Sequence, residues 1–225
     1  MGNKENQPKR IKKPWPTKDA MEQVYEMKLW GSNKSEFYSG DGSHNPNIVD
    51  PYIQVVKSFL TSFTQPLVVC DLGCGDFNVG KELVQYTKQY MAIDIVENLI
   101  KHNREIFKSN QIEFRCLDIS TDDLPSGDCA LLRQVLQHVS NAEILRVVKK
   151  LSAFKYVILT EHLPIGDFEP NKDIISGQGI RLKKQSGLNL LSHPFYLNVK
   201  AEKELLSVVL ENGKGVIKTT LYTMN

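Results

Sequence analysis

The chain has 225 residues, 41% of them hydrophobic and 24% charged, which is enough to bury one large core in a single domain. Basic residues exceed acidic residues by only 28 to 26, so no broad positive surface is expected and nucleic acid is disfavoured as a partner. No apolar run approaches the roughly 20 residues that span a bilayer, and we expect no membrane contact. The cysteines form no CxxC pair and follow no signal-peptide pattern, which favours a cytoplasmic protein with no metal site.

The first residues differ from the rest in composition. Residues 1–16 combine prolines with a local excess of basic side chains, namely Lys4, Lys9, Arg10, Lys12 and Lys13. Such a segment has little apolar surface to bury, so we expect a flexible basic arm. A tail that touches nucleic acid or a membrane surface is the alternative; we adopt a solvated terminus and assign it no function. Residues 17–65 are expected to form an N-terminal cap of helices and loops, ahead of a main domain over 66–225.

From residue 66 onward, short apolar runs alternate with amphipathic stretches, a pattern typical of a parallel sheet with crossover helices. The apolar runs predict strands over 67–71, 91–94, 112–117, 128–133 and 156–160. The amphipathic stretches predict helices over 79–90, 96–107 and 141–151, the last with Ser140 as its N-cap and Glu143 three residues on. We therefore expect a doubly wound α/β domain.

The last third of the chain has a different pattern. Residues 161–198 lose periodicity and are rich in glycine and proline, so we expect a long loop inserted at the carboxyl end of the fifth strand. We interpret it as a lid over the substrate, with a solvated surface loop as the alternative. Two further runs, 204–210 and 216–223, flank a turn and predict a β-hairpin. The complete sheet would then have seven strands, mostly parallel, with a C-terminal antiparallel hairpin.

The turn after the first strand reads Asp71-Leu72-Gly73-Cys74-Gly75-Asp76. Gly73 and Gly75 let the backbone approach a ligand closely, and the start of the next helix presents free N–H groups. A dinucleotide site would need a third glycine where Asn78 stands. Asp71 would repel a pyrophosphate and attract an ammonium group. The turn therefore argues against NAD, the cofactor of a rival oxidoreductase interpretation, and favours S-adenosylmethionine (SAM).

Two further acids follow the next strands. Asp94, at the end of the second strand, is placed to accept hydrogen bonds from ribose hydroxyls, and Asp118, after the third, to take the adenine amino group. Either acid alone is also explained as a turn or cap residue, because acids are frequent in loops after strands. Three acids at successive strand ends indicate a nucleotide-type cofactor.

These motifs, at 69–75, 92–94 and 117–118, resemble the cofactor motifs of class I SAM-dependent methyltransferases. A closer resemblance is to a small bacterial-type group with W-G, S-G-x-G-S and C-G-D-F-N segments, which stand here at 30–31, 39–43 and 74–78. The resemblance implies a cofactor site of Asp71, Gly73, Cys74, Gly75, Asp76, Asn78, Asp94, Ile95, Asp118, Ile119 and Arg133. To the substrate site we assign Trp30, Ser39, Asn171, Asp173 and Arg181.

Two of these segments have a second interpretation. The resemblance favours folding of the 39–43 loop over the amino-acid end of the cofactor, whereas without it the segment is an ordinary flexible turn. In the group, an N-x-D-I-x-x-G-x-R stretch follows the fifth strand; here it begins at Asn171, with Arg181 slightly displaced.

Methyl transfer from a sulfonium is an in-line displacement, so the protein mainly supplies orientation and exclusion of water. A base is needed only where the acceptor atom carries a proton. His138 follows the fourth strand, while Glu161 and His162 directly follow the fifth, at the edge where open α/β sheets bind ligands. We predict these three as catalytic candidates; a backbone hydrogen bond is the alternative for His138.

We therefore expect a SAM-dependent methyltransferase that releases S-adenosylhomocysteine (SAH) and acts on an unidentified small-molecule acceptor. The residues after the fourth strand do not form the Asn/Asp-Pro-Pro-aromatic motif of enzymes that methylate amino groups of nucleic-acid bases. A protein or peptide methyltransferase is the second interpretation, because a long lid also suits a peptide. A non-catalytic binding module with the same fold is the third, and the acids at three strand ends argue against it.

Overall fold

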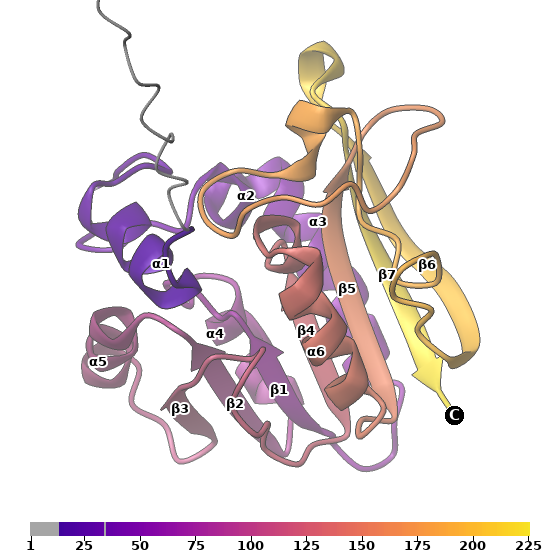
Figure 1. Cartoon of the computed structure of the whole chain (residues 1–225). Coiled ribbons are helices and arrows are strands. Elements are labelled where there is room, and N and C mark those ends of the chain that lie inside the picture. Colours follow the sequence, from indigo (N-terminus) through magenta and orange to yellow (C-terminus); the bar gives the residue numbers. More distant parts are fainter. Residues whose placement is uncertain (1–13, 34) are drawn as a thin grey trace, which may run out of the picture.

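The computed structural model describes residues 14–33 and 35–225, so residues 1–13 of the expected basic arm lie outside the described residues. A seven-stranded sheet has the order β3-β2-β1-β4-β5-β7-β6 (Figure 1). Its strands are β1 Val68–Leu72, β2 Gln89–Asp94, β3 Ile112–Cys116, β4 Cys129–Arg133, β5 Tyr156–Leu163, β6 Val199–Val209 and β7 Val216–Met224. The first five run parallel, and β7 pairs antiparallel with both β5 and β6. The predicted sheet with its C-terminal hairpin is confirmed.

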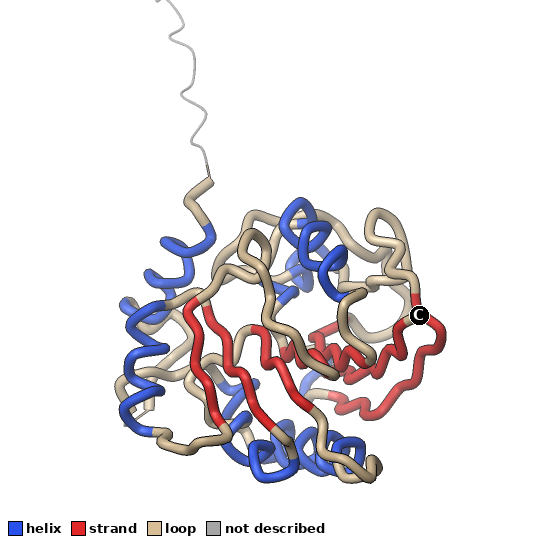
Figure 2. The backbone as a smooth tube through the Cα atoms, turned by 90° about the horizontal axis from the view of Figure 1, so that it is seen from below, coloured by secondary structure: helices blue, strands red, loops and turns tan. Residues whose placement is uncertain are grey.

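Helices cover both faces of this sheet (Figure 2). They are α1 Thr17–Glu26, α2 Asp41–His44, α3 Pro46–Leu60, α4 Gly80–Leu83, α5 Glu97–Ile106 and α6 Asn141–Leu151. Alternate residues of a strand point to opposite faces, so Val69 shares an apolar cluster with Val56 of α3, while Leu72 shares a second cluster with Val147 of α6. None of the helices in the described part of the chain is long and apolar enough to cross a membrane.

The helix α3 belongs to this core, although it lies within the range 17–65 that we expected to form a cap. Asn45 caps it by accepting a hydrogen bond from Asn47 N, and Pro46 occupies its first position. Its buried Val56 and Leu60 are 0% and 1% exposed and share one apolar cluster with Val69 and other strand residues. The sheet therefore receives one of its covering helices from the N-terminal third of the chain.

The predicted helix over 79–90 is wrong in extent. Only α4 is α-helical, a 3-10 turn at Val84–Tyr86 follows, and β2 already begins at Gln89. The β-branched Thr87 ends the helical path because it adopts an extended conformation, with its hydroxyl bonded to Val84 O. Lys88 N then donates to Leu67 O and aligns the chain for the sheet.

The fifth strand is longer than predicted. Its pairing with β7 continues to Leu163 opposite Val216, so Glu161 and His162 lie inside β5. The strand β6 likewise begins at Val199, five residues before the predicted start. The loop is consequently 164–198, with one short 3-10 turn at Arg181–Lys184.

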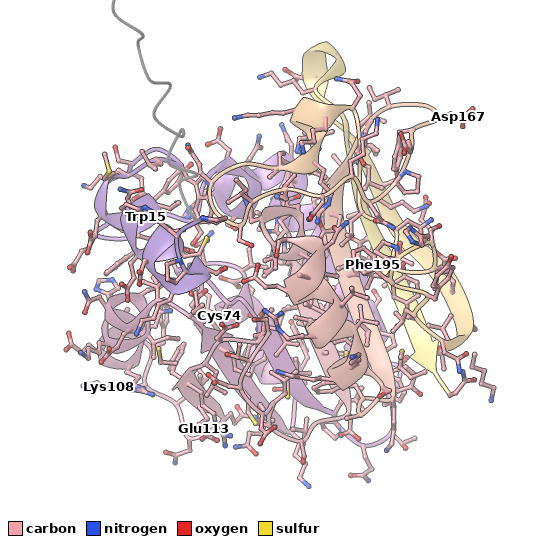
Figure 3. All side chains as sticks on the ribbon, viewed as in Figure 1. Trp15, Cys74, Lys108, Glu113, Asp167 and Phe195 are labelled. Carbon is pink, nitrogen blue, oxygen red and sulfur yellow. The ribbon has the colours of Figure 1, made fainter. Side chains whose placement is uncertain are left out.

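The 164–198 loop packs against the domain. Leu190 and Phe195 are buried in the same apolar cluster as α6, and Figure 3 shows Phe195 beside the sheet with Asp167 at the outer tip of the loop. The Asn171 side chain donates to Asn189 O and His193 O, both at 2.8 Å, and accepts from Asn189 N. The segment is thus packed against the domain, and residues 165–167 at its tip are exposed.

Candidate functional site

A cavity of about 450 Å³ lies at the carboxyl ends of the parallel strands, under α1 and the 39–43 loop. Cys74, labelled in Figure 3, marks the glycine turn at its floor. The predicted site residues that line it are Trp30, Ser39, Asp71, Gly73, Cys74, Gly75, Asp76, Asp94, Ile95, Asp118, Ile119, Arg133 and His138. The other predicted site residues do not line the cavity, namely Asn78, Glu161, His162, Asn171, Asp173 and Arg181. No group of three or more His, Cys, Asp or Glu side chains in the described chain is arranged to hold a metal ion.

Neighbouring segments approach both glycines of the turn closely. Gly73 and Gly75 have φ of 95° and 56°, the left-handed region that L side chains rarely adopt. A Cβ at Gly73 would lie 2.3 Å from Val135 Cγ2, and one at Gly75 would lie 2.5 Å from Ser39 Oγ. Close approach of neighbouring segments, as well as backbone conformation, therefore requires glycine at both positions.

The 39–43 loop lies on this turn and is fixed by Asp76. The Asp76 carboxylate accepts from Ser39 N at 2.9 Å and lies 2.6 Å from His44 Nε2, while Asp76 N donates to Ser39 Oγ at 2.8 Å. Asn78 Nδ2 donates to Ser43 O at 2.8 Å. The segment is therefore hydrogen-bonded in place, and Asp76 and Asn78 organise it, with Asn78 outside the cavity.

The side chain of Arg133, at the end of β4, also contacts the 39–43 loop. Its guanidinium donates to Ser43 Oγ at 3.2 Å and to Gly42 O, and it lies 4.9 Å from the centre of the Tyr52 ring. Its Nε, which is buried, has no hydrogen-bond partner among the described residues. A buried cation at the cavity is suited to an anionic ligand group.

Asp71 places an acid at the same cavity. Its side chain accepts a hydrogen bond from Tyr90 Oη at 2.9 Å and is only 7% exposed. Burial raises the pKa of Asp71 to about 7, against the lowering effects of the Tyr90 hydrogen bond and the Arg133 charge. The carboxyl is consequently poised to ionise when a cation approaches.

The two other acids also face the cavity. Asp94 accepts from Gly75 N and Val96 N, both at 3.1 Å, which fixes its carboxylate at the end of β2. Burial raises the pKa of Asp94, and these backbone donors oppose the rise. Asp118 accepts from Ser120 N at 2.7 Å, the bond of an ordinary turn residue, while it also lines the cavity.

Of the three predicted catalytic residues, only His138 lines the cavity. Its ring lies 5.0 Å from that of Trp30, centroid to centroid, and its Nδ1 is 3.2 Å from Gly177 O. Burial lowers the pKa of His138 to about 4, so the ring is neutral at pH 7. Beside it stands Gln137, which also lines the cavity and which we did not predict. Gln137 is uncharged and belongs to no recognised motif, so only its position next to His138 could have identified it from the sequence.

Glu161 and His162 lie away from the cavity because β5 extends past them. Glu161 is 3% exposed, and within the described chain neither of its carboxyl oxygens has a hydrogen-bond partner. Burial raises the pKa of Glu161 to about 8, with the charge of Arg181 opposing the rise. His162 Nε2 lies 2.7 Å from Lys214 O, at the edge of the hairpin. Neither side chain is placed to touch a ligand in the cavity.

The predicted substrate residues of the long loop hold it in place. Arg181 is 1% exposed and donates to Leu136 O at 3.0 Å and to Val139 O at 2.8 Å. Asp173 Oδ1 accepts from Asn141 N at 2.7 Å, at the start of α6. Both side chains therefore fasten the loop to the segment that carries His138. The loop contributes other residues to the cavity wall: Gln178, Ile180 and Lys183.

An antiparallel β7 between β5 and β6, with a glycine turn and a cavity at the end of β1, is the architecture of a class I methyltransferase fold. Residues 69–154 match a protein family described as a methyltransferase domain. No curated protein sequence is significantly similar to the chain.

Many solved structures share this fold, and three of them serve as examples. The N-methyltransferase NodS from Bradyrhizobium japonicum WM9, in complex with SAH, gives a TM-score of 0.67 at 12% identity, over 92% of this chain and 99% of NodS. The N-terminal domain of EvdMO1, solved in the presence of SAH and D-fucose, gives 0.56 at 13% identity, over 78% and 83%. The methyltransferase domain of bacterial CtHen1-C gives 0.55 at 13% identity, over 79% and 99%.

Proposed function

We propose that the protein is a SAM-dependent methyltransferase that takes SAM into the cavity and releases SAH. The observation that carries the proposal is the presence of both the Asp71 carboxyl and the Arg133 guanidinium at the cavity beside the glycine turn. The amino-acid end of SAM carries an ammonium and a carboxylate, which complement these two groups. A pyrophosphate would instead meet the acid and would lack the third glycine at Asn78.

The remaining cofactor contacts follow the strand ends. Asp94 is suited to the ribose hydroxyls, and Asp118 with Ile119 to the adenine, because all three line the cavity. SAM supplies a methyl group on a sulfonium, whose sulfur keeps the electron pair when the methyl carbon leaves. The protein then needs to position an acceptor and to exclude water.

The acceptor that fits best is a small molecule. Three segments line the cavity from different parts of the chain, namely α1, the 39–43 loop and residues 178–183, and a concave site of this kind favours a small ligand over a peptide. His138 is the group that we assign as base, since it is neutral and lines the cavity. Peptide methylation and binding without turnover are the alternatives, and a screen of SAM consumption against pooled metabolites and peptides separates them.

Calorimetry with SAM, SAH and NAD tests the proposal. We expect SAM and SAH to bind and NAD not to bind. Asp94→Ala should weaken SAH binding by about 1.5–3 kcal/mol, because hydrogen bonds to a buried carboxylate are lost. The matched control is Asp167→Ala at the exposed loop tip, which should bind SAH like the parent. Tight NAD binding without a response to SAH would overturn the assignment.

A further inference from the structure

Asn103 is a polar side chain on the otherwise apolar buried face of α5. The other buried residues of this helix are Leu99 and Ile100. Asn103 is 0% exposed, and in the described chain its Oδ1 has no hydrogen-bond partner. Asparagine favours neither burial nor a helix interior, and an unpaired buried oxygen costs free energy. This cost points to a role for the other half of the amide.

The NH₂ group of this amide contacts the glycine turn. Asn103 Nδ2 donates to Gly75 O at 2.8 Å. A carbonyl oxygen can only accept, so the nitrogen of Asn103, and not its oxygen, must face the turn. Gly75 lines the cavity, whereas Asn103 does not. Asn103 therefore acts on the candidate cofactor site only through Gly75.

The peptide unit between Gly75 and Asp76 is held from both sides. Its carbonyl oxygen accepts from Asn103 on α5, and its N–H donates to Ser39 Oγ at 2.8 Å. Because a peptide unit is planar, these two contacts together fix its rotation. Gly75 N also donates to Asp94 Oδ2 at 3.1 Å, so the same turn orients the acid that we assign to the ribose. Glycine has wide conformational freedom, and such anchors restrict it.

The first half of the turn has other anchors. Gly73 N and Cys74 N both donate to Ile93 O at 2.8 Å, which ties them to β2 independently of α5. Loss of the Asn103 donor should consequently loosen the Gly75–Asp76 peptide while the start of the turn and the sheet keep their positions. This difference separates a local effect on the turn from a general loss of stability.

We infer that Asn103 is a positioning residue for the cofactor, which holds the Gly75–Asp76 peptide in the orientation that binds SAM. The inference rests on the proposed function and adds a residue that acts from behind the cavity. A turn that is already ordered binds more tightly, because no ordering has to accompany binding. Removal of the Asn103 donor should therefore weaken the binding of SAM and SAH alike.

Asn103→Asp tests the donor, because the two side chains have the same shape and differ in the group that faces Gly75. Burial raises the pKa of a carboxyl, so at pH 5 the new group is protonated and can donate, whereas the ionised form cannot. Calorimetry on the full chain from pH 5 to 9 gives the SAH affinity relative to the parent at each pH, which cancels the titration of Asp71. This ratio should fall with rising pH by about tenfold, or about 1.4 kcal/mol. A ratio that does not fall contradicts the inference.

Asn98→Asp is the matched control. It makes the same substitution in the same helix, at an exposed residue that does not line the cavity. Its SAH affinity should equal that of the parent at each pH. Asn103→Leu lacks the donor at every pH, so its affinity should be about tenfold lower throughout, with no recovery at pH 5. Equal SAH affinities of Asn103→Leu and the parent overturn the inference.

Hydrogen exchange by NMR locates the effect within the turn. Asp76 N donates to Ser39 Oγ and Ser39 N donates to the Asp76 carboxylate, and both amides should exchange faster in Asn103→Leu than in the parent. The amides of Gly73 and Cys74, which are anchored to β2, should keep their parental rates. Equal acceleration of all four amides would indicate general destabilisation and would contradict a positioning role. Absence of SAH binding by the parent would instead refute the proposed function.

Discussion

At the scale of single residues, Asp71 couples cofactor binding to pH. Burial raises its pKa from 3.8 to about 7 in the free protein, so near pH 7 the carboxyl is partly protonated. An ammonium bound beside it favours the ionised form, so binding releases a proton. The affinity for SAH should rise with pH from about 6 and level off above 7.

Calorimetry in buffers of different ionisation enthalpy measures this proton release. Asp71→Asn should bind SAH more weakly, and its affinity should lose most of the pH dependence. Equal proton release by the variant and the parent would assign the effect to another group.

We expect Glu161 to affect stability and not binding, because it is buried away from the cavity. Its pKa is about 8 in the fold and 4.5 for the ordinary group, so the folded state favours the protonated form. The stabilisation is fully present below about pH 4.5 and is lost as pH rises through 8. Glu161→Gln should flatten this dependence and raise the free energy of unfolding at pH 9, on the order of 3 kcal/mol. Urea unfolding from pH 5 to 9 measures it, and parallel curves for the two proteins would contradict the prediction.

At the scale of elements, we expect the 164–198 loop to be held in place without ligand. Asn171 N donates to Gly187 O and Leu197 N to Leu190 O, and Arg181 is buried against the β4–α6 segment. We expect these two amides to exchange slowly with solvent even without ligand, while residues 165–167 at the tip exchange fast. Hydrogen exchange by NMR checks this. Fast exchange throughout the loop, slowed only by SAH and acceptor, would restore the mobile lid that the sequence suggested.

The errors of sequence reasoning at this scale have one physical source. The first five strands and the glycine turn follow from local apolar runs and from Gly73 and Gly75, and they were predicted. The end of β5 depends on its pairing with β7, more than fifty residues later, whereas the local apolar run alone predicts that Glu161 follows the strand. For the same reason Arg181 was assigned to the substrate site and Gln137 was not predicted at all, because their hydrogen-bond partners are backbone groups distant in sequence.

At the scale of the whole molecule, residues 17–65 and the sheet unfold together if α3 is part of the core. Leu60 is 1% exposed and packs in the cluster that contains strand residues of β1, β4 and β5. Leu60→Ala should therefore lower the free energy of unfolding by about 2–5 kcal/mol, the cost of a cavity in a packed core. Leu29→Ala, at an exposed site in the same N-terminal region, should change it by less than about 0.5 kcal/mol.

The cooperativity of unfolding completes this test. Circular dichroism and tryptophan fluorescence should give coincident urea transitions in the parent, because residues 17–65 unfold together with the sheet. The two signals report on different regions, since both tryptophans, Trp15 and Trp30, precede α3 while most of the secondary structure lies in the sheet domain. In Leu60→Ala both transitions should shift together to lower urea, since loss of one core contact destabilises the whole unit. Separate transitions, with the fluorescence change alone moved by the substitution, would show that residues 17–65 form a cap that unfolds independently of the sheet.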